Sequence, residues 1–194
     1  VHPMALASPF FCGLGLEEHG LRWLHAGAPL AHPLDGGRAA VLHRDIGKTA
    51  DGLGADCSRY RRIFGPLVSH AGEMFGDALA PLRVPRHPLT LARFGMAAAL
   101  PAAVFARLFK TPEARALFAG NAAHGVMPLN KPLTSAVGLM LQVCAHKVGW
   151  PVAEGGSQSI ADTLVRILKS HGGAIQCGTR IENLAALPPA RAYL

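Results

Sequence analysis

Two adjacent glycines near the end of the chain have the setting of a ligand-binding loop. Gly155 and Gly156 follow an extended stretch and precede a predicted helix that Ser157 or Ser159 can cap. The first N–H groups of a helix are unpaired, and a glycine has no Cβ to block close approach. The loop could therefore face a phosphate or the edge of a ring. The alternative is a tight loop that only packs the helix against a neighbour.

His124 is the second candidate for chemistry. It lies beside glycine and small residues at the predicted end of a helix, in the stretch 118–125. An imidazole at this place could carry a proton or line a pocket. It could equally act as an electrostatic cap for the carbonyl end of the helix. His146 lies on an apolar helix and is interpreted as a core or interface residue.

Other catalytic and metal-binding patterns are absent from the sequence. His2, His32, His43 and Asp45 lack the H-x-x-x-H and H-x-H spacings, so we expect no metal site. There is no G-x-S-x-G elbow, no P-loop and no G-x-G-x-x-G, which excludes a free-standing Rossmann domain. Four cysteines, at positions 12, 57, 144 and 177, form no C-x-x-C pair and are predicted to be buried free thiols in a reducing compartment.

The net charge of +7 comes from basic residues that are spread along the chain. A nucleic-acid site usually has a denser stripe, so we expect no nucleic-acid partner. The charge fits a solvated surface, or else an anionic partner such as membrane lipid or a cofactor phosphate. No apolar run reaches the roughly 18 residues of a membrane span, and the first residues lack the pattern of a secretory leader, so we expect neither. The chain begins with Val1, so we expect a portion to precede it, in a cytoplasmic protein that can contact a membrane.

The first 80 residues predict a small antiparallel sheet and helices. Three extended runs (21–25, 29–33 and 38–43) are expected to form the sheet, with Asp35-Gly36-Gly37 as a hairpin turn. Asp45 is expected to cap a helix that runs to about Leu53. Asp56 is expected to start one longer helix through residue 75, because its apolar residues have helical spacing.

The rest of the chain predicts mainly helices up to Gly149. They cover 90–99, 100–109, 111–123 and 134–148, and the third has Thr111 as its cap and Pro112 in its first turn. After Gly155-Gly156 comes an amphipathic helix that ends at Gly172, followed by predicted strands at 174–177 and 179–184. The predicted fold class is α+β: a helical domain with a small antiparallel sheet at 1–148, and a helix with strands at 149–194.

Three stretches together resemble a known family. They are His2-Pro3-Met4 with Ser8-Pro9-Phe10-Phe11, then Leu117-Phe118-Ala119-Gly120-Asn121-Ala122-Ala123-His124, and then Gly149-Trp150-Pro151-Val152-Ala153-Glu154-Gly155-Gly156-Ser157-Gln158-Ser159-Ile160-Ala161-Asp162. The chain resembles the central part of phytoene-dehydrogenase-like FAD-dependent oxidoreductases, in the superfamily of phytoene desaturases and flavin amine oxidases. The resemblance covers nearly all 194 residues.

The resemblance implies a two-domain FAD enzyme of which this chain is a fragment. Residues 1–148 would be the substrate domain, and 149–194 would return into the FAD domain, whose glycine fingerprint would precede Val1. Gly155 and Gly156, with Ser157 beside them, would lie near the flavin. Ile181 would meet the adenine through its backbone. His124 matches a family position to which the resemblance assigns no role.

The expected function is hydride transfer from a hydrophobic, isoprenoid-like substrate to FAD, with the apolar helices of 89–148 lining the pocket or touching membrane. The alternatives are a non-catalytic helical module that binds a partner or lipid, and a flavin-dependent isomerase or amine oxidase. The chain without the rest of the FAD domain is expected to be inactive, to retain little FAD and to form oligomers through exposed apolar surface.

Overall fold

The computed structural model describes residues 1–81 and 83–193. Helices dominate, and the strands form small antiparallel pairs, in agreement with the α+β class. The helices are α1 (Pro3–Ala7), α2 (Pro9–Gly13), α3 (Ile46–Asp51), α4 (Cys57–Ser69), α5 (Ala71–Ala78), α6 (Pro88–Ala98), α7 (Ala102–Ala106), α8 (Pro112–Ala122), α9 (Thr134–Lys147) and α10 (Gln158–Ser170). The strands are β1 (Trp23–Leu24), β2 (Leu30–Pro33), β3 (Ala39–Leu42) and β4 (Val152–Ala153).

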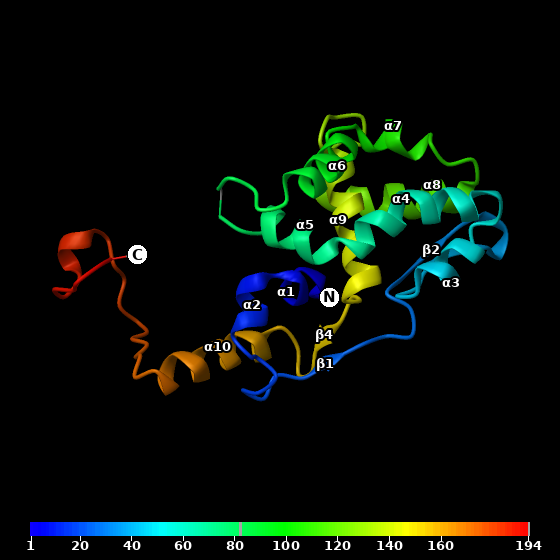
Figure 1. Cartoon of the computed structure of the whole chain (residues 1–194). Helices are drawn as coiled ribbons and strands as arrows, with labels where there is room; N and C mark the ends of the chain where they lie inside the picture. The colour runs from blue at the N-terminus through cyan, green and yellow to red at the C-terminus, as the bar shows by residue number, and fades with distance from the viewer. Residues whose placement is uncertain (82, 194) are drawn as a thin grey trace.

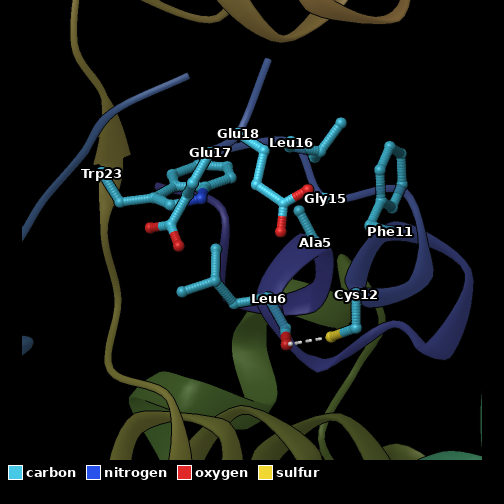
Figure 2. Close-up of a pocket in the computed structure, with 9 residues that line it drawn as sticks. All are labelled: Ala5, Leu6, Phe11, Cys12, Gly15, Leu16, Glu17, Glu18 and Trp23. Atoms are coloured by element: carbon cyan, nitrogen blue, oxygen red, sulfur yellow. Dashed lines mark hydrogen bonds between the residues drawn. The ribbon is translucent and has the colours of Figure 1, made fainter. Parts of the chain in front are cut away.

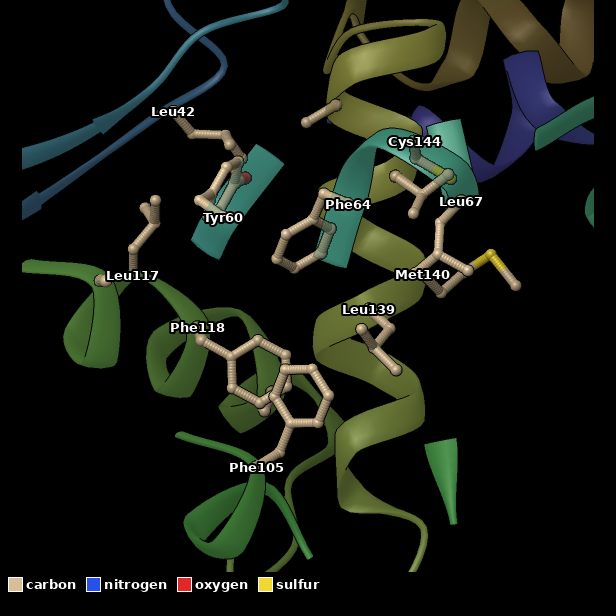
Figure 3. Packing of buried hydrophobic residues seen from close by; sticks show 14 of the residues in the cluster. Leu42, Tyr60, Phe64, Leu67, Phe105, Leu117, Phe118, Leu139, Met140 and Cys144 are labelled. Atoms are coloured by element: carbon tan, nitrogen blue, oxygen red, sulfur yellow. The ribbon is translucent and has the colours of Figure 1, made fainter. Parts of the chain in front are cut away.

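Helix α9 lies in the centre of the helical part (Figure 1), in contact with α1, α4, α5, α6, α7 and α8. Its apolar side chains meet a core of aromatic and aliphatic residues from these neighbours. Phe105 stacks on Phe118 with ring centroids 4.4 Å apart, beside Leu139 of α9 (Figure 3). Gly138 brings α8 close, since a Cβ there would lie 3.1 Å from Ala122 and Phe118 atoms. This core fixes the helices that surround the candidate site.

Several predicted helix ends are confirmed, because local capping sets them. The Asp45 carboxylate accepts a hydrogen bond from the Lys48 N–H at the start of α3. The Thr111 hydroxyl accepts from the Ala114 N–H at the start of α8, with Pro112 in the first turn. Gly149, with a φ of 81°, follows Val148, the C-cap residue of α9.

The prediction of one long helix from Asp56 is wrong. The chain leaves helical geometry at His70, where α4 ends and α5 begins one residue later. Ser69 and His70 side chains both bond the carbonyl oxygen of Pro66, which competes with continuation of the helix. Nor does Asp56 cap α4. Its carboxylate reaches across to residues 110 and 111.

The predicted sheet is confirmed only for its hairpin. Strands β2 and β3 pair with Leu30 opposite Leu42, and Asp35–Gly37 form the connecting 3-10 turn. Strand β1, predicted to join them, instead pairs with β4, with Trp23 opposite Ala153. This second pair brings residues 11–23 against α10, where Leu16, Leu21, Ala153 and Ile167 form a small separate core.

The predicted strands after α10 are not formed. Residues 174–183 have no regular structure, and the tail runs away from the helical part (Figure 1). A strand exists only when a neighbouring edge pairs with its N–H and C=O groups, and this segment meets none within the described residues. Ile181 is therefore on an exposed tail, with 44% of its surface accessible.

Candidate functional site

An apolar pocket of about 530 Å³ lies between the N-terminal segment, α6 and α9. Met140 and Leu141 of α9 and Phe94 of α6 form its walls. The other lining residues are Val1, Pro3, Met4, Ala78, His124, Ala136, Val137 and Trp150. Its size and composition are those of a small-molecule site, which is typically apolar with few polar groups.

Trp150 is held rigidly at this pocket. Its indole N–H donates to the carbonyl oxygen of Leu141 at 3.1 Å, and it is 7% exposed. The hydrogen bond satisfies the polar end of the ring, so the ring presents an apolar surface. Sequence reasoning did not identify Trp150 as a pocket residue, although it lies in the stretch most specific to the family resemblance.

His124 is at the edge of the same pocket, within the 3-10 turn 123–125 that follows α8. Its Nδ1 lies 3.2 Å from the carbonyl oxygen of Gly120, in the last turn of α8. Its ring meets Trp150 edge-on, with centroids 5.8 Å apart. A carbonyl oxygen can only accept, so Nδ1 carries a hydrogen, and Nε2 is the ring nitrogen left for a ligand. His124 thus lines a pocket and also bonds a helix-end carbonyl, so both interpretations apply.

The Gly155-Gly156 loop connects β4 to α10 in left-handed geometry. The φ angles are 78° for Gly155 and 92° for Gly156, and a Cβ added at Gly156 would meet nothing within 4 Å. Ser157 does not cap α10 with its side chain. The Ser159 hydroxyl instead donates to the Glu154 carbonyl oxygen at 2.7 Å. The loop is open to a ligand at Gly156 and closed by a side chain at Gly155.

The N-terminal segment joins this loop to the pocket. The His2 N–H donates to the Pro151 carbonyl oxygen at 2.8 Å, and its Nε2 lies 3.1 Å from the Ser157 hydroxyl. Its neighbours Val1 and Pro3 line the pocket. The structure therefore brings His124, Trp150 and the Gly155-Gly156 loop into one region, through segments that are 150 residues apart.

Ile181 does not join this region. It lies beyond α10, in the exposed tail, and no strand among the described residues pairs with its segment. The residues that the resemblance associates with the cofactor are thus divided. Gly155, Gly156 and Ser157 adjoin the pocket segment, whereas Ile181 does not.

A smaller cavity of about 290 Å³ lies between α1–α2 and residues 15–23 (Figure 2). Cys12 donates its thiol hydrogen to the Leu6 carbonyl oxygen at 3.2 Å there. The prediction that all cysteines are buried is wrong: Cys12 and Cys177 are exposed, Cys57 is half-buried and Cys144 is buried. Cys144 lies fully buried in the main core, and this burial raises its pKa to about 12.

Residues 1–81 and 83–193 contain neither a cluster of metal-ligating side chains nor a helix that could span a membrane. No group of three or more histidine, cysteine, aspartate or glutamate side chains converges within them. None of their helices combines the length and the hydropathy that crossing a bilayer requires.

No family model, curated protein or solved structure matches this chain. The functional assignment therefore rests on the pocket, on the loop beside it and on the residues that carry the family resemblance.

Proposed function

We propose that the chain is the substrate-side portion of an FAD-dependent oxidoreductase similar to phytoene dehydrogenases, and that its pocket takes a hydrophobic substrate. The pocket lining carries this proposal, since ten of its eleven residues are apolar or aromatic and His124 is the exception. Such a lining excludes water and favours a ligand with an extended apolar body. The family resemblance supports the same class of substrate.

The position of the Gly155-Gly156 loop supports a cofactor beside this pocket. Gly156 offers unobstructed backbone, which suits close approach by a flat ring. The described residues do not, however, assemble a dinucleotide site, because Ile181 lies away from the loop on an unpaired tail. FAD would supply the hydride-accepting chemistry. The role of this chain would be to bind the apolar substrate, to orient it against Trp150 and to shield it from water.

Intrinsic fluorescence tests the pocket directly. The chain has two tryptophans, so a Trp23→Phe variant leaves Trp150, in the pocket wall, as the only indole. Titration with geranylgeraniol should produce a saturable change of its emission. Ala136→Phe in the same background fills the pocket and should abolish the change, whereas Ala161→Phe on the exposed face of α10 should preserve it. The absence of saturable binding in the parent variant would refute the pocket assignment.

The cofactor half of the proposal has a separate test. The gene region upstream of the Val1 codon should encode a strand followed by G-x-G-x-x-G, and the longer product should bind FAD. The 194-residue chain alone should retain little flavin. Stoichiometric flavin absorbance in the purified 194-residue chain, or an unrelated upstream sequence, would count against this half.

A second candidate function is a non-catalytic module that binds lipid or a protein partner. One observation favours it: α6 and α7 expose apolar side chains, with Met96 73% and Val104 45% accessible. Such a module would have no need of the pocket. Undiminished binding to its partner by the Ala136→Phe variant, together with failure of the pocket titration, would favour it.

A further inference from the structure

Basic residues occur along the whole chain, but their excess over acids falls in one part of it. Residues 78–153 contain eight Lys and Arg against a single acid, Glu113, a net of +7 that equals the charge of all 194 residues. The remaining residues, 1–77 and 154–194, hold eleven of each sign and are neutral together. Glu113 is itself paired with Arg38, at 2.5 Å. The region that contains α6, α7, α8 and α9 thus has no free carboxylate of its own among the described residues.

This region also exposes an unusual apolar stripe. On α6, Leu89, Arg93 and Met96 follow one another at helical spacing on the outer face, with Leu89 86% and Met96 73% accessible. Phe94 of the same helix points inward and lines the pocket. On the following segment, Val104 and Leu108 are each 45% accessible. An amphipathic helix normally turns such side chains away from water.

The loop 126–133 extends the stripe. Backbone hydrogen bonds fasten it to the α6–α7 junction, from the Leu133 N–H to Ala99 and from the Ala103 N–H to Leu129. Val126 is 92% and Leu133 65% accessible, and both have left-handed φ angles, of 50° and 68°. This backbone geometry is strained for Val126, which is β-branched. Strain that is retained at a surface points to a function. Figure 1 shows this loop with α6 and α7 at one end of the molecule.

Four cations accompany these apolar side chains: Arg93, Arg107, Lys110 and Lys131. All four are exposed. Within residues 1–81 and 83–193, none of their side chains takes part in an ion pair or hydrogen bond. We propose that the face formed by the outer side of α6, by α7 and by the loop 126–133 binds anionic membrane surfaces. Apolar side chains would enter the interfacial layer while the cations contact lipid head groups.

A bilayer fits this face better than other anionic partners. Nucleic acid would leave the exposed apolar side chains in water, whereas a lipid surface covers both kinds of group. The face also shares α6 with the candidate pocket, through Phe94, so a membrane-dissolved ligand would meet the pocket close to the surface. The membrane proposal does not depend on the pocket, because it uses only the outer residues.

Vesicle sedimentation with the full 194-residue chain tests this proposal. Binding to vesicles of phosphatidylcholine with about a third phosphatidylserine should exceed binding to pure phosphatidylcholine, and should fall with salt. Each Lys or Arg at such a surface contributes about five-fold in affinity. The variant Arg107→Glu/Lys131→Glu should therefore lose about 20-fold or more. Leu89→Ser/Met96→Ser should lose about ten-fold, because both side chains are exposed and serve no core contact.

Matched controls lie in the exposed tail. Arg180→Glu/Arg191→Glu makes the same change of net charge, and Ile175→Ser/Leu184→Ser also replaces two exposed apolar side chains by serine. Both should bind within two-fold of the parent chain. Equal losses in the tail controls would overturn the proposal, because only net charge or hydropathy would matter. Equal binding to both vesicle types would also overturn it. A third result would overturn it as well: the chain does not bind vesicles but forms a dimer in light scattering, and Leu89→Ser/Met96→Ser abolishes this dimer. The apolar face would then pair two copies of the chain.

Discussion

The hydroxyl of Tyr60 on α4 donates a hydrogen bond to Nε2 of His146 on α9, at 2.7 Å, in the fully buried centre of the helical part. On the other side of the ring, Nδ1 lies 3.2 Å from the carbonyl oxygen of Arg44 and donates to it. A carbonyl can only accept, so Nδ1 carries a hydrogen, and burial, which lowers the pKa of His146, favours the neutral ring whose bare Nε2 accepts from Tyr60. The pair links α4, α9 and the segment before α3.

This pair predicts that stability falls in mild acid. Burial lowers the pKa of His146, although the Arg44 carbonyl offsets part of the shift. The unfolded chain binds a proton below about pH 6.5 while the folded chain resists it, so the free energy of unfolding should decrease as pH falls below that value. The slope from one such group is at most about 1.4 kcal/mol per pH unit. Urea unfolding at pH 8, 7, 6 and 5 measures it.

The matched variant is His146→Gln, whose amide can still accept from Tyr60 but does not titrate. The difference between parent and variant curves isolates His146 from the other histidines. We expect the parent to lose more stability than the variant between pH 7 and 5. Parallel curves would show that His146 binds its proton equally well in the folded and unfolded chain, and so that its pKa is not lowered by folding. Tyr60→Phe should cost about 1–3 kcal/mol at pH 7, because it leaves Nε2 without a donor.

Asp56 predicts a larger loss. Its Oδ2 accepts three hydrogen bonds, from the Lys110 N–H at 2.7 Å and from the Thr111 N–H and hydroxyl at 2.6 and 2.9 Å. Burial alone would raise the pKa of Asp56, but these hydrogen bonds outweigh it and hold the pKa below the usual value. Asp56→Ala should lower the free energy of unfolding by about 2–4 kcal/mol, since it frees α4 from the start of α8.

Asp51→Ala is the control for Asp56, because its ion pair with Arg61 is exposed and should be worth less than about 1 kcal/mol. Denaturant curves at pH 7 compare the two. The stabilisation by Asp56 is present above about pH 4 and is lost as pH falls through its depressed folded value. Equal losses in both variants would contradict the structural role of Asp56.

The two loop glycines should differ when each is replaced by alanine. Both have positive φ, so each substitution carries backbone strain of about 1–2 kcal/mol. At Gly155 the added Cβ would also lie 2.9 Å from the Ser159 Oγ, which must then leave the Glu154 carbonyl. We expect Gly155→Ala to lower the melting temperature more than Gly156→Ala does. Gly65→Ala, on helix α4 with free space, should raise it slightly.

Removal of the C-terminal tail should leave the stability of the chain unchanged. Residues 174–193 are almost wholly exposed and add no strand to the fold. A chain that stops at Gly173 should unfold within about 0.5 kcal/mol of the parent, since no core contact is lost. Thermal melts followed by circular dichroism measure this. A marked loss would mean that the tail contributes contacts to the helical part.

The sequence predicted those features that depend on a few neighbouring residues. The caps at Asp45 and Thr111 and the end of α9 at Gly149 follow from local hydrogen bonds and backbone conformations. The hairpin of β2 and β3 follows from its turn residues, but the partner of β1 was not predictable in this way. Trp23 pairs with Ala153 across 130 residues, and no local pattern encodes that choice. The strand-like pattern at 174–184 was equally local, and its partner was assumed rather than known.

The candidate site shows the same division. His124 and the Gly155-Gly156 loop were recognised from their own neighbourhoods, and the pocket wall on α9 was expected only as part of a broad apolar region. Met4 and Trp150 were not singled out, because each becomes a pocket residue only when the N-terminal segment packs on α9. Ser157 or Ser159 was expected to cap α10, but the Ser157 hydroxyl meets His2, a partner 155 residues away, and the Ser159 hydroxyl bonds the Glu154 carbonyl. Long-range packing decides these roles.

The bond between His2 and Ser157 has a consequence for the order of folding during synthesis. The pocket has one wall from the first four residues and another from α9 and Trp150, so a nascent chain cannot close it until the ribosome has released about four-fifths of these residues. Until then, Phe94 and Met140 face an open side, and the early helices stay uncovered until α9 has emerged. Chaperone dependence should therefore concentrate in the interval before residue 157 emerges, and a ribosome stalled there should present an aggregation-prone intermediate.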